Sequence, residues 1–215
     1  IGLRVPDHKV TQALLEILGQ PLLGTTLIVP GASEPMNDPQ QIREHFQKTL
    51  QAVIDAGANS AIPHHRPTDA VLAAGDFVKI DFGALVCGYH SDMTRSYVIG
   101  EPTMEQREIY ALVEASHAAG VAALRPGISA RELDTVCRDV FEGAGRLDWY
   151  LHGTGHGVGL EIHESPFHSQ ASEEVIIVGN VVTVEPGIYL PGKFGVRHEN
   201  DVLVTDGGAE VLVEE

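Results

Sequence analysis

Two similar segments of the chain carry carboxylates at matched positions. Residues 75–83 and 179–187 are both strand-like apolar runs between glycines, and each has one carboxylate two residues before its closing glycine. A second carboxylate follows each run further along the chain. The four carboxylates are Asp81, Asp92, Glu185 and Glu199. A repeated pair of acidic strands predicts one site built from two equivalent halves.

Each acidic pair is expected to meet across an antiparallel hairpin. A turn centred between Val86 and Cys87 would place Asp81 opposite Asp92. Opposed side chains of an antiparallel pair point to the same face, with Cβ atoms about 5 Å apart. Two carboxylates that close repel each other unless a proton or a cation lies between them.

The second hairpin follows the same logic. A turn centred on Gly192 would place Glu185 opposite Glu199. A bulge in either strand would shift this register by one residue. If the two hairpins face each other, they supply four oxygen ligands to one pocket, and His156 of the run His152-Gly-Thr-Gly-His156 adds a nitrogen.

This donor set predicts a two-metal hydrolytic site. An oxygen-rich site with one imidazole suits Mn²⁺, and Co²⁺ and Zn²⁺ are the alternatives. Two such ions share a hydroxide nucleophile and polarise a carbonyl group. Residues 153–159 lack the GxGxxG spacing and a following Lys-Ser/Thr, so a phosphate-binding loop is not favoured. A Ser-His-Asp triad is not favoured because the chain has no GxSxG run.

Composition narrows the classes of partner. The 215 residues carry a formal net charge of −16, which argues against nucleic acid or an anionic membrane. No apolar run approaches the ~18 residues of a membrane span, and we expect no signal peptide. Cys87 and Cys137 form no CxxC motif and are expected to be free thiols in the reducing cytoplasm. Because the chain begins at Ile1, we expect a fragment or a processed form.

The hydrophobic pattern predicts helices that alternate with strands. Two helices have clear start signals, a capping box at residues 103–106 and Ser129 to Glu132 for the next. The pattern predicts further helices over Asp7–Leu18 and from Pro39 to Ala56, a strand over Thr25–Val29, and hairpins over Phe77–Gly83 with Tyr89–Ile99 and over Val175–Glu185 with Gly195–Val204.

Residues 58–214 resemble the pita-bread metallopeptidases, on the branch of the Xaa-Pro dipeptidases (prolidases) and Xaa-Pro aminopeptidases. The matching runs are Pro63-His64-His65-Arg66-Pro67-Thr68-Asp69, Ile80-Asp81-Phe82-Gly83, Ser91-Asp92-Met93-Thr94-Arg95, His152-Gly153-Thr154-Gly155-His156-Gly157-Val158-Gly159, Ile162-His163-Glu164, Val184-Glu185-Pro186-Gly187 and Gly195-Val196-Arg197-His198-Glu199. The resemblance implies an α+β pita-bread fold with pseudo-two-fold halves, each a helix with an antiparallel hairpin.

The family also implies roles for individual residues. Asp81 and Asp92 would bind one metal, His156 and Glu185 the other, and Asp92 and Glu199 would bridge them. Glu185 would handle the proton of the attacking water. The pocket lining would comprise His64 and His163 as catalytic hydrogen-bond donors, and His152 and Arg197 as substrate-binding residues. The implied substrate is a short peptide with proline at the second position, and the implied assembly is a homodimer.

Residues 1–57 depart from that family and resemble a fragment of the YrdC/YciO-like family. The chain therefore divides into an atypical segment, 1–57, and a catalytic domain, 58–215, with a junction near Ala56–Ala58. The first half of the fold would be atypical because a strand before Pro63 is missing, and Thr25–Val29 would have to replace it. His198 and Asn200 differ from the residues that the family usually places beside its last ligand.

Other functions remain open at this level. Methionine aminopeptidase and creatine hydrolase activities belong to the same fold, although the run Pro63-His64-His65 favours the proline branch. A second class is a catalytically inactive or truncated pita-bread module that only binds. A third class is nucleotide or double-stranded RNA binding through the N-terminal segment, where basic residues are few.

Overall fold

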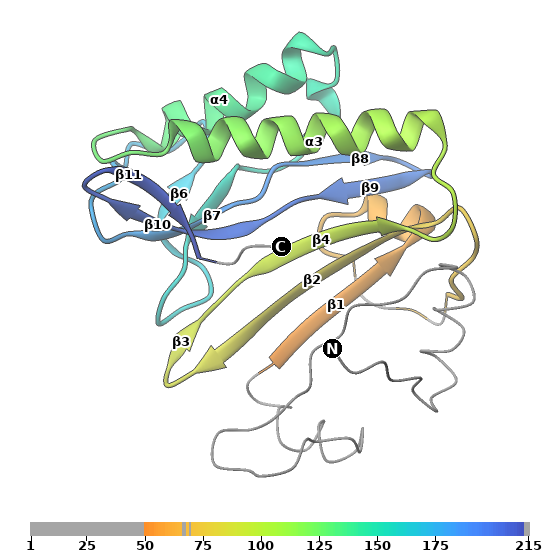
Figure 1. Cartoon of the computed structure of the whole chain (residues 1–215), viewed down its shortest axis with the longest axis horizontal. Coiled ribbons are helices and arrows are strands. Elements are labelled where there is room, and N and C mark those ends of the chain that lie inside the picture. The colour runs from red at the N-terminus through yellow and green to blue at the C-terminus, as the bar shows by residue number, and fades with distance from the viewer. Residues whose placement is uncertain (1–49, 66–67, 69, 213–215) are drawn as a thin grey trace, which may run out of the picture.

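The computed structural model describes residues 50–65, 68 and 70–212 (Figure 1). The predicted helix Asp7–Leu18, the strand Thr25–Val29 and the helix from Pro39 up to residue 49 lie outside these residues. Within the described part, two antiparallel sheets, one strand pair and two long helices form an α+β architecture, as predicted. None of the described helices is long and apolar enough to cross a membrane.

The first sheet holds the first pair of carboxylates. It consists of β1 (Leu50–Ala56), β2 (Phe77–Val86), β3 (Tyr89–His90) and β4 (Met93–Val98). The central strand is β2, which pairs antiparallel with the other three. A short 3-10 helix, η1 (Gly57–Ala61), follows β1.

The second half of the described chain supplies the remaining strands. A five-stranded sheet has the order β11-β10-β7-β5-β6, and a separate pair joins β8 to β9. These strands are β5 (Gly155–Gly157), β6 (Glu164–His168), β7 (Val181–Val184), β8 (Gly187–Leu190), β9 (Phe194–Arg197), β10 (Asn200–Thr205) and β11 (Gly208–Val211).

Two helices lie together over one side of these strands (Figure 1). They are α3 (Met104–Ala123) and α4 (Ala130–Gly143), and a 3-10 turn, η2 (Leu147–Trp149), follows α4. Both helices begin where the sequence predicts. Thr103 and Gln106 form the reciprocal capping box of α3, and the Ser129 side chain accepts from the Glu132 N–H to cap α4.

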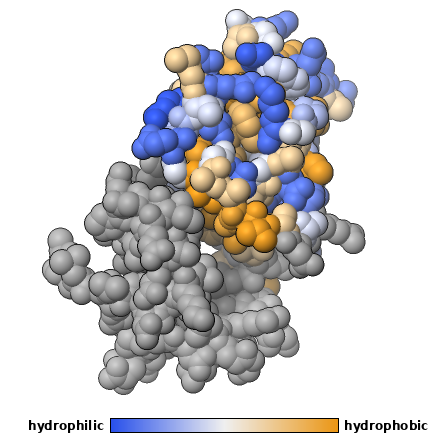
Figure 2. Space-filling model, turned by 90° about the vertical axis from the view of Figure 1, so that its right-hand side faces the viewer, coloured by the Kyte–Doolittle hydropathy of each residue, from blue (hydrophilic) through white to orange (hydrophobic). Residues whose placement is uncertain are grey.

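Two buried clusters hold the layers together. The first joins α3 and α4 to β2, β8 and β9 around Phe77, Phe141 and Ile188. The second joins the end of α3 to β7 and β10 around Leu124, Val184 and Val202. Figure 2 shows hydrophobic side chains gathered at the lower end of the coloured surface.

The predicted helix that ends at Ala56 is wrong over its last turns, because residues 50–56 form the strand β1. All seven residues pair antiparallel with β2, from Leu50 with Ala84 to Ala56 with Val78. The adjacent β-branched residues Val53 and Ile54 favour a strand, and pairing with β2 outweighs the helical spacing of the apolar residues. The strand expected from the sequence to be missing before Pro63 is therefore present as β1.

The two hairpins test the predicted registers. In the second, Gly187 pairs with Arg197 and Val184 with Asn200, so Glu185 and Glu199 lie opposite each other as predicted. In the first, the turn is Cys87-Gly88, with φ of 53° and 86°, and Asp81 pairs with Thr94 instead of Asp92. The error is two residues, and because side chains alternate with period two, Asp92 still belongs to the face of Asp81.

Candidate metal centre

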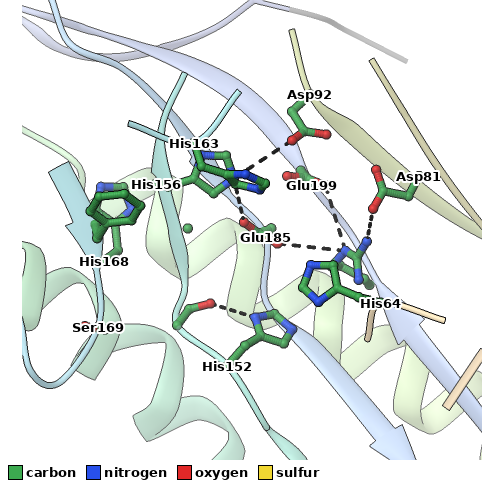
Figure 3. A pocket seen from close by; sticks show the side chains of 14 residues that line it. His64, Asp81, Asp92, His152, His156, His163, His168, Ser169, Glu185 and Glu199 are labelled. Carbon is green, nitrogen blue, oxygen red and sulfur yellow. Dashed lines mark hydrogen bonds and ion pairs between the residues drawn. The ribbon is translucent and has the colours of Figure 1, made fainter. Parts of the chain in front are cut away.

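One cavity collects every residue that the sequence assigns to the site. Its volume is about 320 Å³, and it opens between the first sheet and the strands of the second half (Figure 3). The nine predicted residues that line it are His64, Asp81, Asp92, His152, His156, His163, Glu185, Arg197 and Glu199. The remaining lining includes Phe167, His168 and Ser169 of β6 and the loop after it, which sequence reasoning did not assign to the site.

Three of the carboxylates sit where strands are interrupted. Asp92 precedes β4, Glu185 lies between β7 and β8, and Glu199 lies between β9 and β10. At these breaks the backbone N–H groups find partners on other segments, since a buried N–H needs an acceptor. The N–H of Asp92 donates to Asp201 Oδ2 (3.0 Å). The N–H of Glu185 donates to Thr154 O (2.8 Å). These bonds hold the main chain at Asp92 and Glu185.

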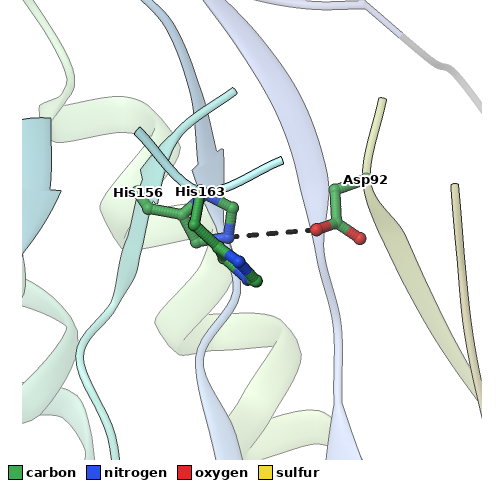
Figure 4. A group of neighbouring side chains, drawn as sticks. All are labelled: Asp92, His156 and His163. Carbon is green, nitrogen blue, oxygen red and sulfur yellow. Dashed lines mark ion pairs between the residues drawn. The ribbon is translucent and has the colours of Figure 1, made fainter. Parts of the chain in front are cut away.

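The side chains converge into groups that can hold a cation. Within each of three groups, one ligand atom per residue lies within 4.8 Å of the others. The groups are Asp81 with Asp92 and Glu199, His156 with Glu185 and Glu199, and Asp92 with His156 and His163. The first two groups share Glu199, and the third contains His163, which the sequence assigned to the pocket and not to a metal (Figure 4).

His156 presents one nitrogen to the carboxylates. Its Nδ1 lies 2.9 Å from Gly157 O and donates to it, because a carbonyl only accepts. The other nitrogen, Nε2, lies 3.3 Å from Glu185 Oε1 and 3.9 Å from Asp92 Oδ2. Burial opposes protonation of His156, but the hydrogen bond and charge of Glu185 outweigh it and raise the His156 pKa. The same nitrogen is available to a metal once the proton leaves.

Crowding of carboxylates marks the centre of the cavity. Burial, together with the charges of Asp81 and Glu185, raises the pKa of Asp92 to about 7. The pKa of Glu199 is also raised well above its usual range, by burial and by the charges of Glu185 and Asp92. Four acidic side chains around one buried space favour a bound cation, which removes this repulsion. The donor set therefore fits a divalent metal ion.

Arg197 lies among the carboxylates. Its guanidinium forms an ion pair with Asp81, and its Nε lies 3.8 Å from Glu199 Oε2 and 3.9 Å from Glu185 Oε2. The side chain is buried, and its Nε also donates to Thr94 Oγ1 (3.0 Å). Arg197 thus offsets part of the negative charge.

The histidines of the pocket differ in what their rings contact. His152 Nδ1 donates to Gly153 O (2.7 Å), and its Nε2 lies 2.7 Å from Tyr189 Oη. The hydroxyl of Tyr189 accepts from Arg197 Nη1 (3.1 Å) and donates to His152, so both ring nitrogens are engaged. Burial lowers the pKa of His152 and keeps the ring neutral.

His64 and His163 are more open to the cavity. Both are exposed, and the His163 ring packs against His156 with centroids 4.4 Å apart. Burial and the His156 charge lower the pKa of His163. His168, by contrast, is buried, and its pKa is lowered to about 4, chiefly by burial.

Comparisons with known proteins agree with this geometry. The model of metallopeptidase family M24 matches residues 38–206. The chain belongs to this family. It is 46% identical over 165 residues to a Xaa-Pro dipeptidase of Pyrococcus furiosus, covering 77% of this chain and 47% of that protein. It therefore spans about half the length of such curated relatives.

Solved structures lead to the same fold. The prolidase from Pyrococcus furiosus matches with a TM-score of 0.75 at 46% identity, covering 76% of this chain and 49% of that one. A Xaa-Pro dipeptidase from Bacillus anthracis matches with a TM-score of 0.77 at 41% identity, covering 81% and 50%. The predicted pita-bread fold is thereby confirmed for this M24 chain.

The N-terminal segment has a match of its own. A second family model, described as telomere recombination, matches residues 1–72. This confirms the predicted resemblance of the N-terminal segment to the YrdC/YciO-like family. The two matches overlap over residues 38–72, which include β1.

Proposed function

We propose that this M24 chain is the catalytic part of a dinuclear metal-dependent peptidase that hydrolyses Xaa-Pro bonds. The observation that carries the proposal is the pair of ligand groups that share Glu199 within one cavity. The names of the relatives, Xaa-Pro dipeptidase and prolidase, support the substrate class.

The overlapping ligand groups support a division of the residues between two ions. Asp81 and Asp92 would hold the first ion, His156 and Glu185 the second, and Asp92 and Glu199 would bridge them. A set of oxygen donors with one or two imidazoles suits Mn²⁺, and Co²⁺ or Zn²⁺ would also fit. When bound, the ions would supply a shared hydroxide nucleophile and polarise the scissile carbonyl.

The protein groups around the ions would manage protons and charge. Burial disfavours ionised Glu185, but the hydrogen bond from His156 and the charges of Arg197 and His156 lower its pKa to about 2. Glu185 is therefore ionised at neutral pH and can accept the proton of the attacking water. His64 and His163 line the open side of the cavity, where an N–H would stabilise the tetrahedral intermediate.

The substrate is a short peptide with proline at its second position. The cavity of about 320 Å³ has room for a small ligand, and His152, Phe167 and Arg197 form part of its wall. The net charge of −16 for the whole chain argues against a nucleic-acid substrate.

Metal analysis combined with turnover tests the proposal. After Mn²⁺ loading, elemental analysis should find two ions per chain, and the same sample should hydrolyse Ala-Pro. Glu199→Ala should lose metal and turnover, whereas Glu210→Ala, an exposed position on β11, should keep both. Two bound ions without turnover would favour the alternative of an inactive pita-bread module.

The match over residues 1–72 motivates a second candidate, nucleotide or RNA binding by the N-terminal segment. Binding of this kind would weaken steeply with salt, because it depends on phosphate contacts. A fluorescence titration with a short double-stranded RNA and with ATP at 50 and 200 mM salt tests it. Absence of binding at low salt would remove this candidate and leave the peptidase proposal unaffected.

A further inference from the structure

Lys79 is a fully buried lysine in the strand that carries Asp81. Its exposed fraction is 0%, and its side chain points toward the segment that follows η1. The ammonium group lies 2.9 Å from Ile62 O, 3.0 Å from Pro63 O and 3.5 Å from Ser60 O. Burying a charge is costly unless its hydrogen-bond donors are satisfied. Three main-chain carbonyls of one short segment satisfy the three donors here.

Asp55, on the neighbouring strand β1, is a further partner of the Lys79 ammonium. It pairs in register with Lys79 across β1 and β2, and its Oδ2 lies 3.5 Å from the ammonium. Its Oδ1 lies 3.2 Å from His65 Nδ1. The residues on either side of His64 are therefore both held, Pro63 by its carbonyl and His65 by its ring. His64 itself lines the cavity.

The main chain that Lys79 holds is also linked to the carboxylates, through Arg197. Pro63 O accepts a second hydrogen bond, from Arg197 Nη1 at 3.1 Å. This guanidinium forms the ion pair with Asp81 and lies 3.8 Å from Glu199. Pro63 O therefore accepts hydrogen bonds both from Lys79 and from Arg197, the guanidinium that lies among the carboxylates.

We propose that Lys79 is a positioning residue, which fixes the main chain of residues 60–64 so that His64 faces the cavity and Pro63 O holds Arg197. The lysine also contributes to stability, since replacing it alone would leave the buried Asp55 carboxylate and three main-chain carbonyls without their partner. The catalytic consequence rests on the proposed peptidase function, in which His64 contacts the substrate. The geometric consequence does not depend on it.

NMR of metal-free protein with ¹³C-labelled histidine tests the geometry. The His64 Cε1–H signal, assigned by its loss in His64→Asn, should narrow in Lys79→Met because the ring becomes mobile. The control Lys193→Met, at an exposed ion pair with Glu105, should leave it unchanged. An unchanged His64 signal in Lys79→Met would overturn the proposal. If Lys79→Met does not fold, Asp55→Asn serves instead, with the same narrowing expected and the same unchanged signal as the contradicting outcome.

Turnover of Ala-Pro tests the catalytic consequence through a double-mutant cycle. Lys79→Met should lower kcat/KM on the order of 10- to 100-fold, the cost of a misplaced contact. In the His64→Ala background the same change should cause a smaller loss, because the part that acts through His64 is already gone and only the part that acts through Arg197 remains. Losses that multiply in the double variant would contradict the role in positioning His64. Absence of turnover in the unmodified protein would count against the peptidase proposal alone, because the NMR result stands without it.

Discussion

Thr94 and Glu199 join the two halves of the cavity by two hydrogen bonds. The Glu199 N–H donates to Thr94 O (3.2 Å), and the Thr94 hydroxyl donates to Glu199 Oε2 (2.5 Å). Both residues are buried, and they lie 105 positions apart in the chain. The contact orients the carboxylate that belongs to two of the three ligand groups. Thr94 does not itself belong to any of them.

Thr94→Val should weaken metal binding while keeping all the ligands. Loss of a hydrogen bond that orients a ligand typically costs 10–100-fold in metal affinity. Calorimetric titration with Mn²⁺ should show this decrease. Thr205→Val, at the far end of β10, is the matched control and should bind normally. Equal affinities for the two variants would show that the contact does not orient Glu199 for a metal.

Asp92→Asn should stabilise the metal-free protein and weaken its response to metal. The Asp92 pKa is about 7 in the native protein and 3.8 in the unfolded chain. Between these two values the unfolded chain releases the proton and the native protein keeps it, so stability falls as the pH rises from 3.8 to 7. Removing this charge should raise the free energy of unfolding at pH 8 by roughly 1–4 kcal/mol. Urea unfolding in EDTA measures it.

Mn²⁺ should stabilise the unmodified protein more than it stabilises Asp92→Asn. Mn²⁺ at a free concentration of about 100 times its Kd should stabilise the unmodified protein by about 2.7 kcal/mol, because the ion binds only the native state. Asp92→Asn should gain much less. A Tm of the unmodified protein that does not change between EDTA and Mn²⁺ would count against a metal centre.

Gly120→Ala should destabilise the packing of α3 on the strands. A Cβ atom at Gly120 would lie 2.7 Å from Cys137 Sγ and 2.9 Å from Val184 Cγ1, next to Glu185. Overpacking of this kind costs about 1–3 kcal/mol. Gly143→Ala is the control, since its Cβ would meet nothing within 4 Å, and it should be neutral or stabilising by up to about 1 kcal/mol. Chemical unfolding of both variants decides the comparison.

His117 should make the protein less stable in mild acid. Burial, followed by the charges of His198 and Arg95, lowers its pKa from 6.5 to about 3. Below pH 6.5 the unfolded chain binds a proton at this residue and the native state does not, so stability is lost as the pH falls. Between pH 6.5 and 5 the loss should be about 2 kcal/mol. His117→Gln should remove that part of the pH dependence, and an identical pH dependence in both proteins would rule it out.

The sequence predicted the local features of the fold for identifiable reasons. The capping box at Thr103 and the cap at Ser129 are short-range signals, and both helices begin there. The register of the second hairpin follows from its Pro-Gly-Lys turn. The first register was wrong by two residues because the turn lies at Cys87-Gly88, one residue beyond the position expected. The strand β1 was missed because its apolar spacing also fits a helix, and only pairing with β2 decides between them.

The donor set was determined by the sequence alone. Repeated carboxylates and a glycine-flanked histidine indicate a metal site, because the chemistry of a ligand is a property of its residue type. The contacts that orient those donors were decided by the tertiary structure. Thr94, Tyr189 and Lys79 act on Glu199, His152 and Pro63 across long stretches of chain. No local pattern records such pairs, since they exist only once the two halves pack around the cavity.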